Sequence, residues 1–102
     1  MAIKQDYMQR PFSGRLNSGD ITTITLDTTP EYWHITCSGG AELQVYSGNS
    51  RSNEYWILSH YFNQLRIKAV TNSITLEAIG GNTIYTVTAL VNNDNFIHNM
   101  GG

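Results

Sequence analysis

The segment NSITLEAIGGNTIYTVTALV, residues 72–91, contains two apolar runs separated by Gly80-Gly81-Asn82. In the first run, residues 74–78, apolar and polar side chains alternate, which is the pattern of a β-strand with one buried face. The second run, residues 83–91, is mostly apolar on both faces and is therefore expected at the centre of a sheet or at an interface. The segment predicts two β-strands joined by a tight glycine turn.

The same alternation continues upstream of this segment. It predicts further strands near residues 12–16, 21–26, 31–38, 43–46, 55–59 and 64–69. No stretch shows a helical period with capping residues. We therefore expect an all-β fold: a single antiparallel β-sandwich or jelly-roll-like domain of about seven to eight short strands with extended N- and C-terminal arms.

A chain of 102 residues is long enough for one hydrophobic core but not for two domains. Residues 1–19 lack sustained periodicity and are predicted to form an extended N-terminal arm. Residues 20–91 form the expected β-sandwich core, and residues 92–102 are a polar C-terminal tail. Both ends also carry apolar side chains that are expected to reach neighbouring molecules: Ile3, Tyr7, Met8, Phe12, Phe96, Ile97 and Met100.

The tripeptide Glu-Tyr-Trp occurs twice, at residues 31–33 and 54–56, and these two copies contain both tryptophans of the chain. Each copy begins a predicted β-hairpin, and the first hairpin is expected to turn at Gly39-Gly40. Strand alternation places Trp33 on the same apolar face as Ile35. Both tryptophans are therefore predicted to be core anchors of a duplicated scaffold.

The outward faces of these two hairpins are the candidate interaction sites. Tyr32, His34, Gln44 and Tyr46 are expected to lie together on the first hairpin, and neutral surfaces rich in tyrosine are typical of interfaces. A solvated sheet face and a sugar-stacking surface are the alternatives. The full set of candidate interface residues is Tyr32, His34, Gln44, Tyr46, Tyr55, Ile57, Phe12, Phe96 and Ile97.

The composition of the chain is unusually poor in charge. Charged residues make up 14% of it, where about 25% is usual for soluble domains. The net charge is −2 and the six Lys and Arg residues are scattered, which disfavours a nucleic-acid partner. A neutral polar surface of this kind favours contact with other protein copies.

The sequence contains no residue pattern that is typical of catalysis or metal binding. The three histidines have no metal-ligand spacing, and Cys37 has no second cysteine to form a zinc motif or an internal disulfide. Its alternation with Trp33 and Ile35 predicts a buried, unreactive thiol. There is no GxSxG motif and no phosphate-binding glycine loop. We expect a non-enzymatic protein with no catalytic residue, cofactor or metal.

The chain also shows no signal peptide and no run approaching the roughly 18 apolar residues of a membrane span. With a single cysteine, it is expected to fold in a reducing cytoplasm without contact with a membrane.

The runs DITTITLDTTP (residues 20–30), NSITLEAIGGNTIYTVTALV and MAIKQDYMQRPFSGRLNSGD (residues 1–20) cover most of the chain. In composition it resembles the small all-β accessory proteins of tailed-phage virions, especially capsid decoration or cement proteins. The resemblance implies a protein that stabilises a shell by binding the major capsid protein or another virion protein, often as a trimer, without catalysis. It also implies a virion location after assembly in the host cytoplasm.

Two other functions compete with this interpretation. A carbohydrate-binding β-sandwich module of a tail or adhesion apparatus would use the tyrosine-rich face. A small enzyme or enzyme subunit would need a site based on Cys37 or a histidine.

Overall fold

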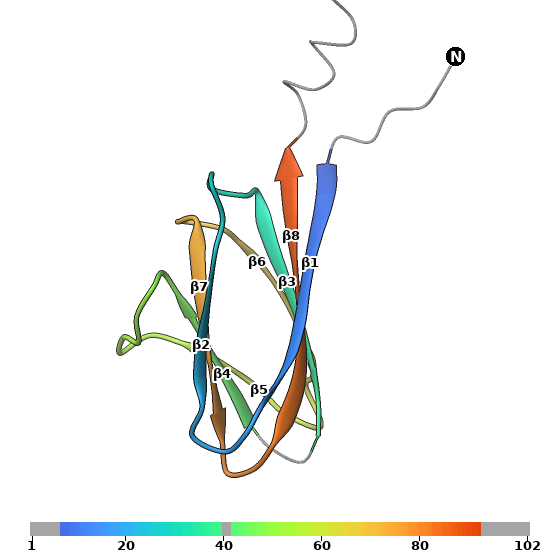
Figure 1. Cartoon of the computed structure of the whole chain (residues 1–102), viewed down its shortest axis with the longest axis vertical. Coiled ribbons are helices and arrows are strands. Elements are labelled where there is room, and N and C mark those ends of the chain that lie inside the picture. The colour runs from blue at the N-terminus through green and yellow to red at the C-terminus, as the bar shows by residue number, and fades with distance from the viewer. Residues whose placement is uncertain (1–6, 40–41, 93–102) are drawn as a thin grey trace, which may run out of the picture.

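A computed structural model of the chain describes residues 7–39 and 42–92. The regular structure in these ranges consists of eight β-strands: β1 (Tyr7–Leu16), β2 (Ile21–Thr25), β3 (Tyr32–Ser38), β4 (Glu42–Ser47), β5 (Trp56–Leu58), β6 (Gln64–Lys68), β7 (Ser73–Ile79) and β8 (Thr83–Asn92). The strands form two four-stranded antiparallel sheets, which face each other (Figure 1). Sheet A has the order β1-β8-β3-β6, and sheet B has the order β2-β7-β4-β5.

The strand pairing follows a nested pattern. β1 pairs with β8, β2 with β7, β3 with β6 and β4 with β5. The chain is thus paired like one long hairpin, closed between β4 and β5, and this hairpin is rolled so that β3 also pairs with β8 and β4 with β7. This arrangement is a jelly roll. The prediction of an antiparallel β-sandwich or jelly-roll-like domain is confirmed.

The core fills the space between the two sheets. Alternate residues of the central strands point inward, as in β3, where Trp33, Ile35 and Cys37 are all buried. β8 lies between β1 and β3, so the prediction of a central strand from the two-sided apolar run is confirmed. The largest fully buried side chain is that of Trp33, which is 1% exposed, and its assignment to the core is also confirmed.

The predicted hairpins are wrong. β3 belongs to sheet A and β4 to sheet B, so the chain crosses between the sheets after Gly39 instead of returning to pair with β3. β5 and β6 are likewise in different sheets, which leaves the repeated Glu-Tyr-Trp runs without the duplicated scaffold expected of them. Glycine turns mark where a strand stops, but the sheet that the next strand joins depends on partners far away in sequence.

The expected N-terminal arm is also different in the structure. Residues 7–16 form β1, which pairs with β8 along its whole length, from Tyr7 opposite Asn92 to Leu16 opposite Thr83. Pro11 suggested a break in regular structure, but β1 is the edge of sheet A, where a strand tolerates proline. The remaining parts of the predicted arm and tail, residues 1–6 and 93–102, lie outside the described residues.

Gly14 is the other residue of β1 that was expected to interrupt a strand, and a side chain of the neighbouring strand packs over it. Gly14 lies opposite Tyr85 of β8, and a Cβ atom added at Gly14 would be 2.7 Å from the Tyr85 hydroxyl and 3.0 Å from the ring. The tyrosine therefore occupies the space that a side chain at position 14 would take. Such cover by an aromatic ring is a known way to stabilise a glycine in an edge strand.

Candidate interaction surface

The structure separates the residues that were expected to form one interaction face. Tyr32 and His34 lie on the outer face of sheet A, whereas Gln44 and Tyr46 lie on the outer face of sheet B. The two pairs are on opposite sides of the sandwich because β3 and β4 do not pair. Phe12 is half-buried and packs against the core, and Phe96 and Ile97 lie outside the described residues.

Tyr46 is on the outer face of its sheet but is only 4% exposed. Its hydroxyl donates a hydrogen bond to Gln44 Oε1 at 2.6 Å and lies 3.3 Å from Glu77 Oε1. Burial raises the pKa of Tyr46, and the negative charge of Glu77 raises it further. The Tyr55 ring packs on the Tyr46 ring, with 5.3 Å between centroids. Tyr46 therefore acts as a structural residue of the folded chain.

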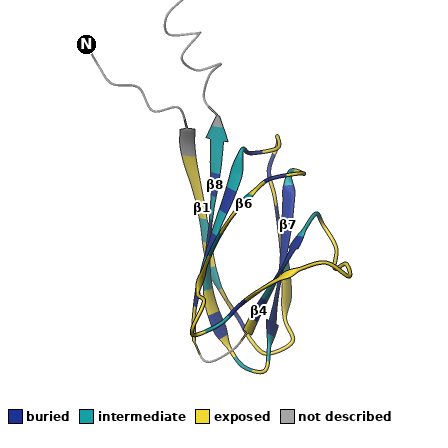
Figure 2. Cartoon of the chain, turned by 180° about the vertical axis from the view of Figure 1, so that it is seen from behind, coloured by how far each residue is buried: buried dark blue, intermediate teal, exposed yellow. Residues whose placement is uncertain are grey.

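The segment that joins β4 to β5 covers part of sheet B. Thr75 Oγ1 donates a hydrogen bond to the Gly48 carbonyl at 2.9 Å, and Arg51 Nη1 lies 3.4 Å from Glu77 Oε2. As a result, β7 is buried on both of its faces over most of its length (Figure 2). The centre of sheet B is thus shielded, and its two edge strands, β2 and β5, remain open.

Exposed apolar side chains gather at and after β5. Trp56 is 39% exposed, Phe62 58% and Tyr61 95%, and Tyr55 and Ile57 are exposed as well. We call these five residues the aromatic ridge. Residues 55–62, which contain the ridge, include no Asp, Glu, Lys or Arg. An exposed apolar patch without charge is the usual mark of a surface that binds a partner.

The ridge is exposed because of its place in the fold. β5 has only three residues and is the edge of sheet B, so nothing lies beyond it in the sheet. The prediction that Trp56 is a core residue is therefore wrong. Trp56 pairs with the buried Val45, which puts it on the inward side of its strand as expected, but the edge leaves its indole partly uncovered.

The size of the ridge can be compared with known interfaces. Its four aromatic side chains expose roughly 350–600 Å², if a full aromatic side chain contributes about 150–250 Å². A stable protein interface buries roughly 800 Å² on each partner. The ridge therefore supplies about half of such a surface and its most apolar part, where binding energy is usually concentrated.

Two ridge residues were missed from the sequence. Tyr61 and Phe62 are not among the predicted interface residues, although two adjacent aromatic residues in a loop are themselves an interface signal. Tyr55 and Ile57 were proposed correctly as outward-facing residues beside Trp56, and their role in an interface stays a prediction.

Reactive groups do not gather in the described part of the chain. Cys37 is buried, and burial raises the pKa of its thiol. No three His, Cys, Asp or Glu side chains within residues 7–39 and 42–92 are placed to hold a metal ion. Over the same ranges, no helix is present that could cross a membrane.

No protein-family model matches the chain, and no curated protein matches its sequence. A functional assignment therefore has to come from the surface of the molecule itself.

Proposed function

We propose that this chain is a non-enzymatic structural protein of a tailed-phage virion, of the capsid decoration or cement type. It stabilises the shell through protein–protein contacts, and its copies associate with one another through the aromatic ridge. The observation that supports this proposal best is the uncharged ridge of five exposed apolar residues on and after the edge strand β5.

The fold is compatible with the proposal but does not select it. Jelly rolls occur in viral capsid proteins and also in lectins and cupins, and one fold hosts many functions. The resemblance in composition to virion accessory proteins favours the viral assignment and a trimer.

A second copy of the chain is the occupant that best suits the ridge. The ridge lacks charge, as does much of the chain, so association would desolvate few ionic groups. In a closed trimer each ridge would contact a different surface of the next copy, because a three-fold interface is heterologous. An edge strand left open in a monomer also invites unwanted pairing, which an oligomer contact at β5 would prevent.

Light scattering of the purified chain tests the oligomer part of the proposal. The wild-type chain is expected to be trimeric, and the double variant Tyr61→Ser, Phe62→Ser is expected to be monomeric. Val70→Ser is the matched control, because Val70 is 71% exposed but lies in the connection between β6 and β7. A monomeric wild-type chain, or a double variant that remains trimeric, would contradict the assignment of the ridge.

The virion part of the proposal needs a separate measurement. Mass spectrometry of purified virions from the source of this sequence should detect the chain at a copy number comparable to that of the shell proteins. Its absence from intact particles would exclude the decoration role without affecting the ridge.

Carbohydrate binding by the ridge is the second candidate function. Tyr61, which is 95% exposed, could stack on a sugar ring. However, small-ligand sites are usually concave, and two pockets formed by described residues are lined by other residues than the ridge. A glycan array probed with the wild-type chain and with Tyr61→Ser tests this function. Carbohydrate binding by the ridge requires a sugar that the wild-type chain binds and the variant does not.

A further inference from the structure

The outer face of sheet A is the side of the sandwich opposite the shielded sheet B. Strand alternation and pairing identify the outward residues of β1, β8, β3 and β6. Three of them are permanent cations, Arg15, Arg66 and Lys68, and His34 lies opposite Arg66. From Gln9 to Leu90, none of the outward residues of these strands is Asp or Glu. We call this surface the cationic face.

The cations of this face have no acidic partner within the described chain. The ion pair within the described residues joins Arg51 to Glu77, which is on sheet B. The guanidinium of Arg66 lies 4.8 Å from the centre of the Tyr32 ring, which holds it against the sheet. The net charge of the chain is −2, yet none of its described acidic residues is among the outward residues of these strands. Glu31 adjoins the face, because its backbone bonds Leu90 and Ala69 directly before β3, but alternation with Tyr32 directs its side chain to the other side of the sheet.

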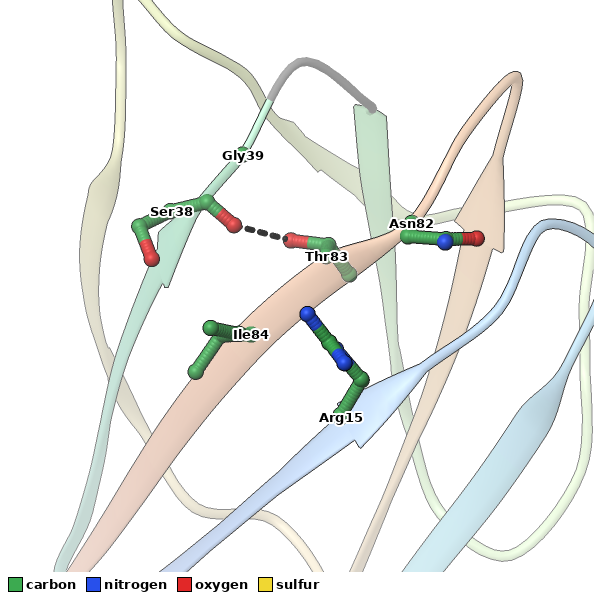
Figure 3. Close-up of a pocket in the computed structure, with 6 residues that line it drawn as sticks. All are labelled: Arg15, Ser38, Gly39, Asn82, Thr83 and Ile84. Atoms are coloured by element: carbon green, nitrogen blue, oxygen red, sulfur yellow. Dashed lines mark hydrogen bonds between the residues drawn. The ribbon is translucent and has the colours of Figure 1, made fainter.

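Arg15 lies at a shallow pocket at one corner of the cationic face. The pocket has a volume of about 110 Å³ and is lined by six residues from three strands and their turns (Figure 3). Thr83 Oγ1 donates a hydrogen bond to the Ser38 carbonyl at 2.9 Å, so this hydroxyl is already engaged. Asn82 Oδ1 accepts a hydrogen bond from the Ser18 amide at 3.2 Å, which leaves its NH₂ group as a donor. Figure 3 shows the Asn82 side chain directed away from Arg15, so the pocket offers the Arg15 guanidinium, a group that suits a carboxylate.

We infer that the cationic face binds an acidic surface of another protein, with one carboxylate in the Arg15 pocket and others near Arg66 and Lys68. This inference does not depend on the aromatic ridge, which lies on and after the edge strand of the other sheet. Charge complementarity between two surfaces guides association and fixes their orientation.

The spacing of the cations favours a protein over a nucleic acid. Arg66 and Lys68 are two residues apart on β6 and so lie roughly 7 Å from each other. Arg15 is three strands away and level with Ser38, four to six residues further along the sheet, so roughly 20–25 Å separate it from the other two cations. Affinity for nucleic acid comes mainly from Lys and Arg residues that contact successive phosphates, and three widely spaced cations provide few such contacts. Between the cations lie threonines and the half-exposed Ile84, which resemble the centre of a protein interface.

Fluorescence anisotropy with a short fluorescein-labelled oligoglutamate peptide tests the inference, and a single-stranded oligonucleotide of equal charge serves as the competing probe. The peptide is expected to bind the wild-type chain more tightly than the oligonucleotide does. The variant Arg15→Gln, Arg66→Gln, Lys68→Gln should weaken peptide binding about tenfold. Arg10→Gln is the matched control and should bind like the wild type, because Arg10 pairs with the inward-facing Ala89.

NMR shift mapping on the wild-type chain provides a second readout that does not need the variants to fold. The peptide is expected to shift amide signals of β1, β3, β6 and β8, including that of Arg15, and not those of residues 55–62. No peptide binding, shifts confined to sheet B or the ridge, or tighter binding of the oligonucleotide would each overturn the inference. If the peptide binds the cationic face while the ridge variant is still trimeric, only the proposed oligomer contact fails.

Discussion

Trp56 lies opposite Val45 in the β4–β5 pair, but Val45 is fully buried and Trp56 is 39% exposed. Paired residues in an antiparallel sheet share a face, so both side chains are on the inward side of sheet B. They differ because β4 is flanked by β7 and β5, whereas β5 has no strand beyond it. An inward tryptophan on an edge strand therefore becomes part of the surface that the molecule offers to partners.

The two tryptophans should differ in their effects on stability. Trp33→Ala is expected to lower the free energy of unfolding by about 3–5 kcal/mol, the usual cost of emptying a large buried site. Trp56→Ala should cost about half of that or less, because much of the indole already contacts water. Urea unfolding at low protein concentration, where oligomers dissociate, measures both changes. Equal losses for the two variants would show that Trp56 is a core residue after all.

Gly14 should resist substitution because of Tyr85. In Gly14→Ala the new Cβ would be 2.7 Å from the Tyr85 hydroxyl, so the ring has to move, and a loss of about 1–3 kcal/mol is expected. Ser13→Ala, on the same strand with an exposed side chain, is the control and should have little effect. In a double-mutant cycle with Tyr85→Ala, the two losses should add to more than the double variant shows. Strict additivity would refute the contact.

Stability should fall at alkaline pH because of Tyr46. Its pKa in the folded chain is raised by burial and by Glu77, so the folded state holds the proton more tightly than the unfolded state does. The stability that this provides is fully present below about pH 10, the ordinary tyrosine pKa, and is lost as the pH rises through the folded pKa. Tyr46→Phe should show a smaller loss above pH 10 in urea unfolding. Identical pH profiles for the two chains would contradict this assignment.

Cys37 should be unreactive in the folded chain. Its thiol is buried and its raised pKa keeps it protonated, whereas thiol reagents attack the thiolate. Reaction with a chromogenic disulfide reagent is expected to be much slower in buffer than in urea. Rapid modification of the native chain would instead support the alternative of an enzyme with a reactive cysteine.

Local patterns predicted the strands well. Alternation placed one strand at residues 31–38 and another at residues 83–91, close to the observed bounds of β3 and β8. Alternation is informative because a strand with one buried face carries apolar side chains at every second position. Alternation does not specify which strands pair, and the two predicted hairpins, β3 with β4 and β5 with β6, were wrong. Only residues 12–16 of β1 were predicted as a strand, because proline and glycine usually interrupt one. In the structure Pro11 is tolerated at the edge of the sheet, and Gly14 is covered by Tyr85.

The candidate surface was predictable only in part. Alternation identified Tyr55 and Ile57 as outward-facing, but Tyr46 shares this property and is nevertheless buried by the segment before β5. Whether an outward residue meets water depends on loops whose path the strand pattern does not specify. The cationic face was missed for a related reason, since Arg15, Arg66 and Lys68 are scattered in sequence and share a face only when β1 and β6 join one sheet.

Hydrogen exchange measured over a range of protein concentrations tests the aromatic ridge most directly. If copies associate through the ridge, backbone amides in residues 55–62 should become more protected as the concentration rises, while those near Val70 should not change. The same protection should be absent in the variant Tyr61→Ser, Phe62→Ser. Concentration-independent exchange in residues 55–62, together with protection that develops elsewhere, would contradict the assignment of the ridge as the contact between copies.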